Sequence, residues 1–245
     1  MTGTARLAIF PVVHVQSVDQ AQQQAALALD AGADGVYLID HGSGAADLLE
    51  SAFNAVTQRH PSAFIGLNFL AIGCGVDAFA HVHQCVTAGR LRRYPNALWV
   101  DDALPLTSPH STHADVPDLK AAVPELSCVA YLGGVAFKYT RTYTDDPEQA
   151  ATEASALVTH VDVVTTSGPG TGKPPSPEKL RAMKAAAGPV PLAAASGVDA
   201  GNIADLRPYL DVVLVASSIE TQPYSGEFDR GRLAEIIRLA QGDEC

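Results

Sequence analysis

The stretch that decides the fold runs from Val161 to Glu220 and contains three short apolar segments. They read Val161-Asp-Val-Val-Thr-Thr-Ser-Gly-Pro-Gly-Thr-Gly-Lys-Pro174, Pro191-Leu-Ala-Ala-Ala-Ser-Gly-Val198 and Asp211-Val-Val-Leu-Val-Ala-Ser-Ser-Ile-Glu220. Each apolar segment ends in small Gly, Ser or Thr residues, and helical patterns separate the three. At the carboxyl ends of parallel strands such turns offer backbone N–H groups and hydroxyls to an anion. The stretch therefore predicts a phosphate-binding edge of a parallel sheet.

The same alternation of strand and helix extends over the whole chain and gives eight units. The apolar runs show no polar alternation, which is typical of strands buried on both faces of a parallel sheet. The predicted strands are Leu7–Val13, Gly35–Ile39, Phe64–Leu70, Ala97–Val100, Ser127–Leu132, Val161–Thr165, Pro191–Ala195 and Asp211–Ala216. Eight units favour a single-domain α/β fold over residues 1–245, the (β/α)₈ TIM barrel. The alternative, an open doubly wound sheet, usually has fewer strands, and the first strand–helix turn lacks its glycine fingerprint.

The composition excludes several classes of partner. The chain has 245 residues, of which 47% are hydrophobic and 18% charged, and its formal net charge is −11. That charge argues against nucleic acid and anionic membranes as partners. No apolar stretch approaches the roughly 20 residues that span a bilayer, and the N-terminal run is too short for a signal peptide. The four cysteines (Cys74, Cys85, Cys128 and Cys245) lack CxxC spacing, so we expect reduced thiols in a cytoplasmic protein.

Polar and ionisable residues follow the first five predicted strands, where a barrel places its chemistry. Polar side chains at these strand ends have little structural reason to be there. The candidate catalytic residues are His14, Asp40, Asn68, Asp101 and Lys138. They suit general acid–base chemistry, and Lys138 could instead form a Schiff base, contact a phosphate or simply be exposed at the rim.

The sequence assigns no metal ligands. The carboxylates and the histidine at the strand ends leave a divalent metal open as a cofactor, but no HxH or HExxH spacing at these ends identifies a site. His81 and His83 lie two residues apart in a predicted helix, so their side chains would point to different faces. We expect no metal site from that pair.

The ends of the last three strands are small and hydroxylic, which suits a phosphate site. The candidate phosphate-binding residues are Ser167, Gly168, Gly170, Thr171, Gly172, Lys173, Ser196, Gly197, Ser217 and Ser218. The glycines would also fit a simple turn, and Lys173 would also fit a solvated loop. Asp199 and Asn202 are better explained as helix caps than as ligands.

Four motifs in this region are similar to the BtpA/SgcQ-like family of (β/α)₈ proteins. They are Ser167-Gly-Pro-Gly-Thr-Gly-Lys-Pro174, Ala195-Ser-Gly-Val-Asp-Ala-Gly-Asn202, Val215-Ala-Ser-Ser-Ile219 and Phe228-Asp-Arg-Gly-Arg232. Upstream, Gly66-Leu-Asn-Phe69, Phe137-Lys138 and His14 also resemble that family. The C-terminal motifs are similar as well to phosphoribosylanthranilate isomerase, whose Gly-Thr-Gly-Lys loop and last two strand ends hold a substrate phosphate. That isomerase uses a Cys after its first strand, where this chain has His14, so the resemblance does not bring its catalytic pair.

The resemblance implies binding of a phosphorylated, ribosyl-like or sugar-phosphate small molecule. We expect an enzyme that performs glycosidic cleavage, isomerisation or lyase chemistry, with Asp40 or Asp101 as acid or base and with Lys138 and His14 stabilising charge. A Lys138 aldolase-type lyase is one form of this hypothesis. The alternative is a noncatalytic BtpA-like biogenesis, assembly or regulatory protein that binds a phosphate ligand. We also expect a homo-oligomer, only because barrels of this kind often associate through helix faces or loops.

Overall fold

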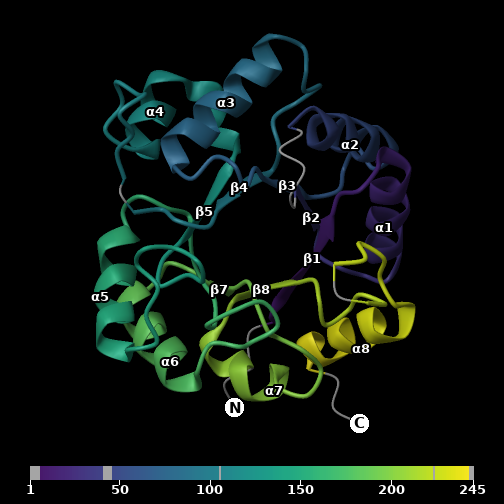
Figure 1. Ribbon diagram of the computed structural model, residues 1–245, viewed down its shortest axis with the longest axis vertical. Helices are drawn as coiled ribbons and strands as arrows, with labels where there is room; N and C mark the ends of the chain where they lie inside the picture. Colours follow the sequence, from purple (N-terminus) through teal and green to yellow (C-terminus); the bar gives the residue numbers. More distant parts are fainter. Residues whose placement is uncertain (1–5, 41–45, 105, 223, 243–245) are drawn as a thin grey trace.

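The computed structural model describes residues 6–40, 46–104, 106–222 and 224–242. Within these ranges, eight parallel strands form a closed barrel in the order β1 to β8, and β1 closes the ring by pairing with β8. The helices lie on the outside of this ring (Figure 1). The predicted (β/α)₈ fold is therefore confirmed.

The element bounds lie close to those that the sequence predicts. The strands are β1 (Ala8–His14), β2 (Val36–Ile39), β3 (Ile65–Asn68), β4 (Ala97–Val100), β5 (Ala130–Gly134), β6 (Val163–Thr166), β7 (Leu192–Ala194) and β8 (Val212–Val215). The helices are α1 (Val18–Asp30), α2 (Ala46–Arg59), α3 (Gly75–Thr87), α4 (Val116–Ala122), α5 (Pro147–Leu157), α6 (Pro177–Ala187), α7 (Ile203–Leu206) and α8 (Arg230–Gln241), with 3₁₀ helices η1 (Pro124–Cys128) and η2 (Arg207–Tyr209). No helix in the described ranges combines the length and the apolar character that a bilayer crossing requires.

Two elements differ from the prediction for local reasons. The run predicted as a strand from Ser127 begins instead inside η1, because Pro124 starts a short helical turn and the strand follows only at Ala130. The helix that the eight-unit pattern places after the seventh strand is reduced to the four residues of α7. Asp199 accepts backbone hydrogen bonds from Gly201 and Asn202, which forms a turn in place of the first helical turn.

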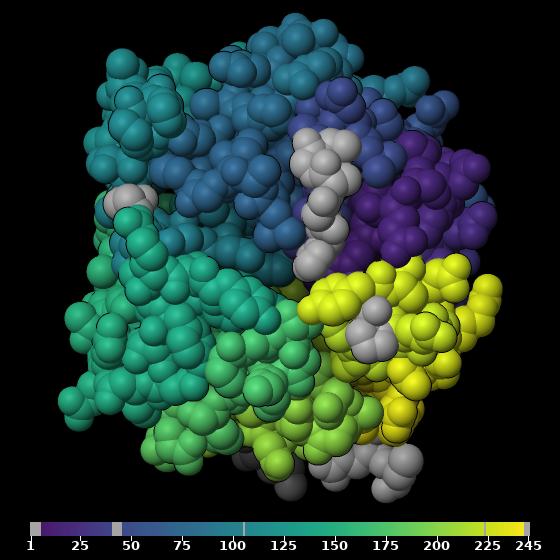
Figure 2. Space-filling model, in the orientation of Figure 1, coloured from purple at the N-terminus to yellow at the C-terminus, as the bar shows by residue number. Residues whose placement is uncertain are grey.

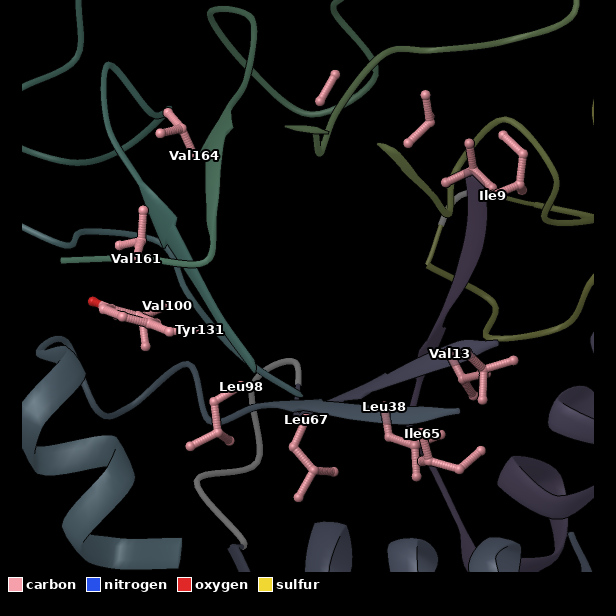
Figure 3. Packing of buried hydrophobic residues seen from close by; sticks show 14 of the residues in the cluster. Ile9, Val13, Leu38, Ile65, Leu67, Leu98, Val100, Tyr131, Val161 and Val164 are labelled. Carbon is pink, nitrogen blue, oxygen red and sulfur yellow. The ribbon is translucent and has the colours of Figure 1, made fainter. Parts of the chain in front are cut away.

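The strands are mostly apolar because both faces of the sheet are buried, and their polar residues lie at the carboxyl ends. In β2, Leu38 belongs to the cluster that packs against the helices, whereas Tyr37 and Ile39 belong to a second cluster inside the barrel. Figure 3 shows the outward side chains of several strands pointing away from the ring. Inside the barrel, the Tyr37 ring packs directly against Gly66. A Cβ at residue 66 would lie only 2.2 Å from this ring, so the contact requires glycine. The barrel interior is thus a packed core below its mouth.

One buried cation joins α6 to the carboxyl ends of β5 and β6. Lys179 is fully buried, and its Nζ donates to the carbonyl oxygens of Ala136 at 2.7 Å and Ser167 at 2.9 Å. The ammonium also lies over the Tyr143 ring, 5.0 Å from its centroid. Burial lowers the pKa of Lys179 to about 8. Because the two carbonyls belong to loops that continue into the candidate site, this lysine fixes the position of both loops.

Replacement of Lys179 by Met should leave those two buried carbonyls without their donor. We expect the free energy of unfolding to fall by about 2–4 kcal/mol, measured by urea denaturation. Lys184→Met on the same helix is the control, because Lys184 is 31% exposed and pairs with Asp211 at the surface. The control should lose about 1 kcal/mol or less. Equal losses in the two variants would contradict the role assigned to Lys179.

Candidate active site at the carboxyl ends of the strands

A cavity of about 490 Å³ opens at the carboxyl ends of the strands. Figure 2 shows this face, on which the green segments after β5 and β6 lie close to the yellow segment after β8. Its floor is apolar and includes Val12, Ile39, Trp99 and Leu214 from the barrel interior. Nine residues predicted from the sequence line its wall, namely His14, Asp101, Lys138, Thr171, Gly172, Ser196, Gly197, Ser217 and Ser218.

Asp101 and Lys138 bring opposite charges to one wall of the cavity. Burial raises the pKa of Asp101 to about 6, although a hydrogen bond from Asn68 and the charge of Lys138 both favour its ionised form. The Asn68 amide donates to Asp101 at 3.1 Å. Burial also lowers the pKa of Lys138, and the charge of Asp101 opposes this change. Both pKa values therefore move towards neutrality, which suits proton transfer near physiological pH.

His14 is held by a carboxylate that the sequence analysis did not select. Nδ1 of His14 lies 2.7 Å from Oε1 of Glu220, which is fully buried. Glu220 also accepts from the backbone N–H groups of Tyr224 at 2.7 Å and Gly226 at 3.3 Å. A carboxylate at Nδ1 fixes the orientation of the imidazole and places its proton on Nδ1. The only signal in the sequence was an acidic residue directly after the small residues that end β8.

The loops after β6 and β7 approach each other so closely that they require glycine. Gly197 has a φ of +69°, and a Cβ there would lie 2.1 Å from the Lys173 carbonyl carbon and the Pro174 nitrogen. Within the β6 loop itself, a Cβ on Gly168 would lie 2.2 Å from the Lys173 carbonyl oxygen, so this loop is tightly folded as well. Ser196 Oγ completes the contact by donating to the Gly170 carbonyl at 3.0 Å. These two loops are therefore locked together at the edge of the cavity.

Lys138 reaches this locked pair of loops. Its Nζ lies 3.4 Å from Ser196 Oγ, and its backbone N–H donates to Ser167 Oγ at 2.7 Å. Ser167 Oγ in turn donates to the Gly168 carbonyl at 2.9 Å. Ser218 Oγ donates to the Val198 carbonyl at 2.8 Å and joins the β7 and β8 loops. The cation and the hydroxyls thus meet at one end of the cavity.

Six predicted site residues lie outside the cavity lining. Asp40 is buried at the end of β2, and Asn68 is buried where it supports Asp101. The other four, which shape the β6 loop, are Ser167, Gly168, Gly170 and Lys173. The short helix α7 has only four residues, so loop N–H groups and hydroxyls rather than a helix dipole face the cavity from β7.

Two exposed tyrosines in unusual backbone conformations stand at the rim. Tyr139 and Tyr224 have φ values of 64° and 61°, in the left-handed region that few non-glycine residues adopt. The Tyr224 ring lies 5.7 Å from the ring of His14, and both tyrosines line the cavity. Backbone strain concentrates at functional sites because the surrounding structure must hold it there. Sequence patterns gave no signal for either residue.

The raised pKa of Asp101 predicts a specific dependence of stability on pH. Unfolded Asp101 releases its proton near pH 3.8, whereas the folded protein holds it up to about pH 6. Between these values the folded state binds more protons, so wild-type stability falls as pH rises. Relative to Asp101→Asn, the wild type should lose about 1–2 kcal/mol across this window, allowing for solvent screening of a partly exposed group. Urea unfolding at several pH values measures the difference.

Asp229 provides a control of opposite sign. It is the N-cap of α8, and hydrogen bonds from the backbone of Arg232 and Gly231 lower its pKa. The stabilising effect of ionised Asp229 is present at neutral pH and is lost as pH falls. Asp229→Asn should therefore be less stable than the wild type at neutral pH, and the difference in unfolding free energy should shrink in acid. A flat pH dependence of the difference between the wild type and Asp101→Asn would contradict the pKa assignment.

Comparison with solved structures finds the same fold in several phosphate-related proteins. Phosphoribosyl anthranilate isomerase from Thermus thermophilus is 16% identical, with a TM-score of 0.62 over 96% of this chain and 98% of that chain. The enzyme of that name from Thermotoga maritima is 13% identical, with a TM-score of 0.65 over 96% and 99%. Thiamine phosphate pyrophosphorylase from Pyrococcus furiosus is 12% identical, with a TM-score of 0.60 over 96% and 96%. At these identities the likeness shows the fold alone.

Comparison of the sequence with known proteins gives the family. No curated protein matches the chain. The model of the BtpA family, in contrast, matches residues 113–242, which is more than half of the chain and includes β5 to β8 with the loops that follow them. The expected relationship is therefore confirmed, and the chain belongs to the BtpA family.

Proposed function

We propose that this protein is an enzyme that acts on a phosphorylated, ribosyl-like or sugar-phosphate small molecule. One observation carries the proposal: a single cavity brings the hydroxyl- and glycine-lined ends of β6 to β8 together with His14, Asp101 and Lys138. The first group would bind a phosphate, and the second would perform acid–base chemistry on the rest of the substrate. The fold is shared with proteins named for phosphoribosyl and phosphate compounds, which agrees with this assignment.

The phosphate would lie against the β7 and β8 loops. Thr171, Gly172, Ser196, Gly197 and Ser217 face this part of the cavity from three different loops. Lys138 Nζ, 3.4 Å from Ser196 Oγ, supplies a positive charge at the same place. Serine hydroxyls, loop N–H groups and one lysine together form the kind of environment that stabilises a phosphate dianion. Such a local site is compatible with the overall net charge of −11.

The chemistry would take place between Asp101, Lys138 and His14. Asp101, with its pKa raised to about 6 by burial, can exchange a proton near neutral pH. His14, held by Glu220, would donate to or accept from a developing charge on the substrate. Tyr139 and Tyr224 offer exposed rings at the rim, which would favour a substrate with a sugar or a heterocycle. Glycosidic cleavage and isomerisation both fit this arrangement.

A lyase with Lys138 as the nucleophile is the second candidate. Burial lowers the pKa of Lys138, which increases the fraction of neutral amine that can attack a carbonyl. In that mechanism Asp101 would transfer the protons during Schiff-base formation. A binding protein without turnover remains the noncatalytic alternative. The cytoplasmic location and the homo-oligomer expected from the sequence stay predictions.

The phosphate site can be tested by adding charge to it. In a thermal-shift panel of ribose 5-phosphate, other sugar phosphates, phosphorylated nucleosides and inorganic phosphate, with and without magnesium, at least one compound should raise the wild-type Tm. Ser217→Asp should weaken binding of that compound by about 10-fold or more, because a carboxylate would repel the phosphate. Ser155→Asp, which adds the same charge on the exposed surface of α5, should leave the affinity unchanged.

The outcomes separate binding from chemistry. Asp101→Asn should keep the thermal shift and lose turnover, because it removes the acid–base group and leaves the serines, glycines and Lys138 of the proposed phosphate site in place. If no phosphorylated compound in the panel shifts the wild-type Tm, the proposed phosphate site is wrong. A ligand that binds without being converted would favour the noncatalytic alternative.

The lyase candidate predicts a covalent adduct at Lys138. Borohydride added together with a carbonyl-containing sugar phosphate should reduce the Schiff base to a stable amine, which mass spectrometry would place on Lys138. Lys138→Met should give no adduct. Lys173, which follows the glycines of the β6 loop and is exposed, serves as the control, and its replacement by Met should leave the adduct intact. Turnover without any trapped adduct would favour acid–base chemistry alone.

A further inference from the structure

Three potential metal ligands converge between α2 and α3, outside the barrel and apart from the cavity. His81 and Cys85 lie four residues apart on α3, so their side chains share one face of the helix. Glu50 reaches them from α2. Cys85 and Glu50 are buried, and the His81 side chain is partly exposed. None of the three lines the proposed catalytic cavity.

The spacing of the three donor atoms matches one coordination sphere. Cys85 Sγ lies 3.3 Å from Glu50 Oε1 and 3.4 Å from His81 Nε2, and the last two atoms are 3.6 Å apart. Around a tetrahedral zinc ion with ordinary bond lengths, sulfur lies about 3.5 Å from nitrogen or oxygen, and nitrogen lies about 3.3 Å from oxygen. The observed triangle differs from this one by a few tenths of an ångström. A cation at its centre would therefore need little movement of the side chains.

We propose that Glu50, His81 and Cys85 form a binding site for a thiophilic divalent cation such as Zn²⁺. A thiolate, an imidazole and a carboxylate form a ligand set that Zn²⁺ accepts, and the partial exposure of His81 leaves room for water as the fourth ligand. Edge-on packing of the Phe69 ring, 4.9 Å from that of His81, fixes the imidazole. This site is independent of the proposed phosphate chemistry.

Entry of the cation raises the net charge of the site by one unit. The Cys85 thiol donates a hydrogen bond to Glu50 Oε1 at 3.3 Å, so it carries its proton in the metal-free protein. Binding of Zn²⁺ forms a zinc–sulfur bond and releases that proton to solvent. The thiolate and the Glu50 carboxylate then offset the two positive charges of the ion. The Arg90 guanidinium beside Glu50 leaves the site with one net positive charge, and its side chain is exposed enough for water to screen it. Arg90, whose guanidinium donates to Glu50 Oε1 at 2.9 Å, would remain as an orienting partner of the carboxylate.

The competing explanation is a hydrogen-bond network without metal. The Cys85 thiol donates to Glu50, and Arg90 does the same, so the cluster is satisfied as it stands. Such a network needs no particular distance between Cys85 and His81 and would not respond to Zn²⁺ or Co²⁺. The two explanations therefore differ in a spectroscopic signature.

The test is Co²⁺ titration of the full-length chain after treatment with EDTA. The wild type should develop a thiolate-to-cobalt charge-transfer band in the near ultraviolet together with visible bands of tetrahedral cobalt, and equimolar Zn²⁺ should abolish both. Cys85→Ser should lose the charge-transfer band. His81→Gln should weaken metal binding by more than about 10-fold. Because His81 is partly exposed, that variant keeps the test valid if Cys85→Ser does not fold.

Matched controls come from the same helix and from another thiol. His83→Gln alters a histidine two residues away that instead contacts Tyr94, and Cys128→Ser removes an exposed thiol. Both should bind Co²⁺ as the wild type does. Absence of the charge-transfer band in the wild type would overturn the proposal. Persistence of the band in both Cys85→Ser and His81→Gln would also overturn it.

Discussion

Closure of the parallel sheet is the constraint on which the rest of this structure depends. Because β1 pairs with β8 as well as with β2, none of the eight strands that the structure describes has an unpaired edge, and all eight carboxyl ends open on one face. Residues that lie far apart in the chain therefore meet there, as do His14 and Glu220 across 206 positions. The backbone hydrogen bonds of the ring fix the directions from which these side chains approach. The closed barrel is therefore sufficient to bring the predicted cavity-lining residues from six strand ends together.

Buried charges hold the ring's loops in the arrangement that the cavity requires. Lys179 joins the β5 and β6 loops through two carbonyls, and Glu220 joins the β8 loop to the end of β1 through His14 and two backbone N–H groups. A buried charge without partners would cost several kcal/mol. Loop conformations that remove the partners of Lys179 or Glu220 are therefore unfavourable. Stability and the position of the site are thus linked through the same atoms.

The fold was predictable from the sequence because its main signals are local. Each apolar run and each strand–helix unit can be recognised from residues that are neighbours in the sequence. Once the eight strands are assigned, the residues at their carboxyl ends are known as well. Asp101, Lys138 and Ser196 were predicted in this way, and all three line the same cavity. Glu220 was missed as a site residue because its role depends on a contact with β1 that no local pattern records. Cys85 and Glu50, the metal ligands that we propose, were not predicted for the same reason, because Glu50 reaches His81 and Cys85 only when α2 packs beside α3.

The contact between Lys138 and Ser196 connects the two halves of the proposed site. A phosphate dianion bound beside Ser196 would place negative charge near Lys138 Nζ, which lies 3.4 Å from the serine oxygen, and would favour the ammonium form of the lysine. That ammonium in turn favours the ionised form of Asp101, since the charge of Lys138 already acts on this carboxylate. The negative charge of the phosphate itself acts on Asp101 in the opposite sense and favours its protonated form. Lys138 is therefore the group through which binding of the phosphate and protonation of Asp101 are linked, because its charge offsets part of the repulsion between the two anions.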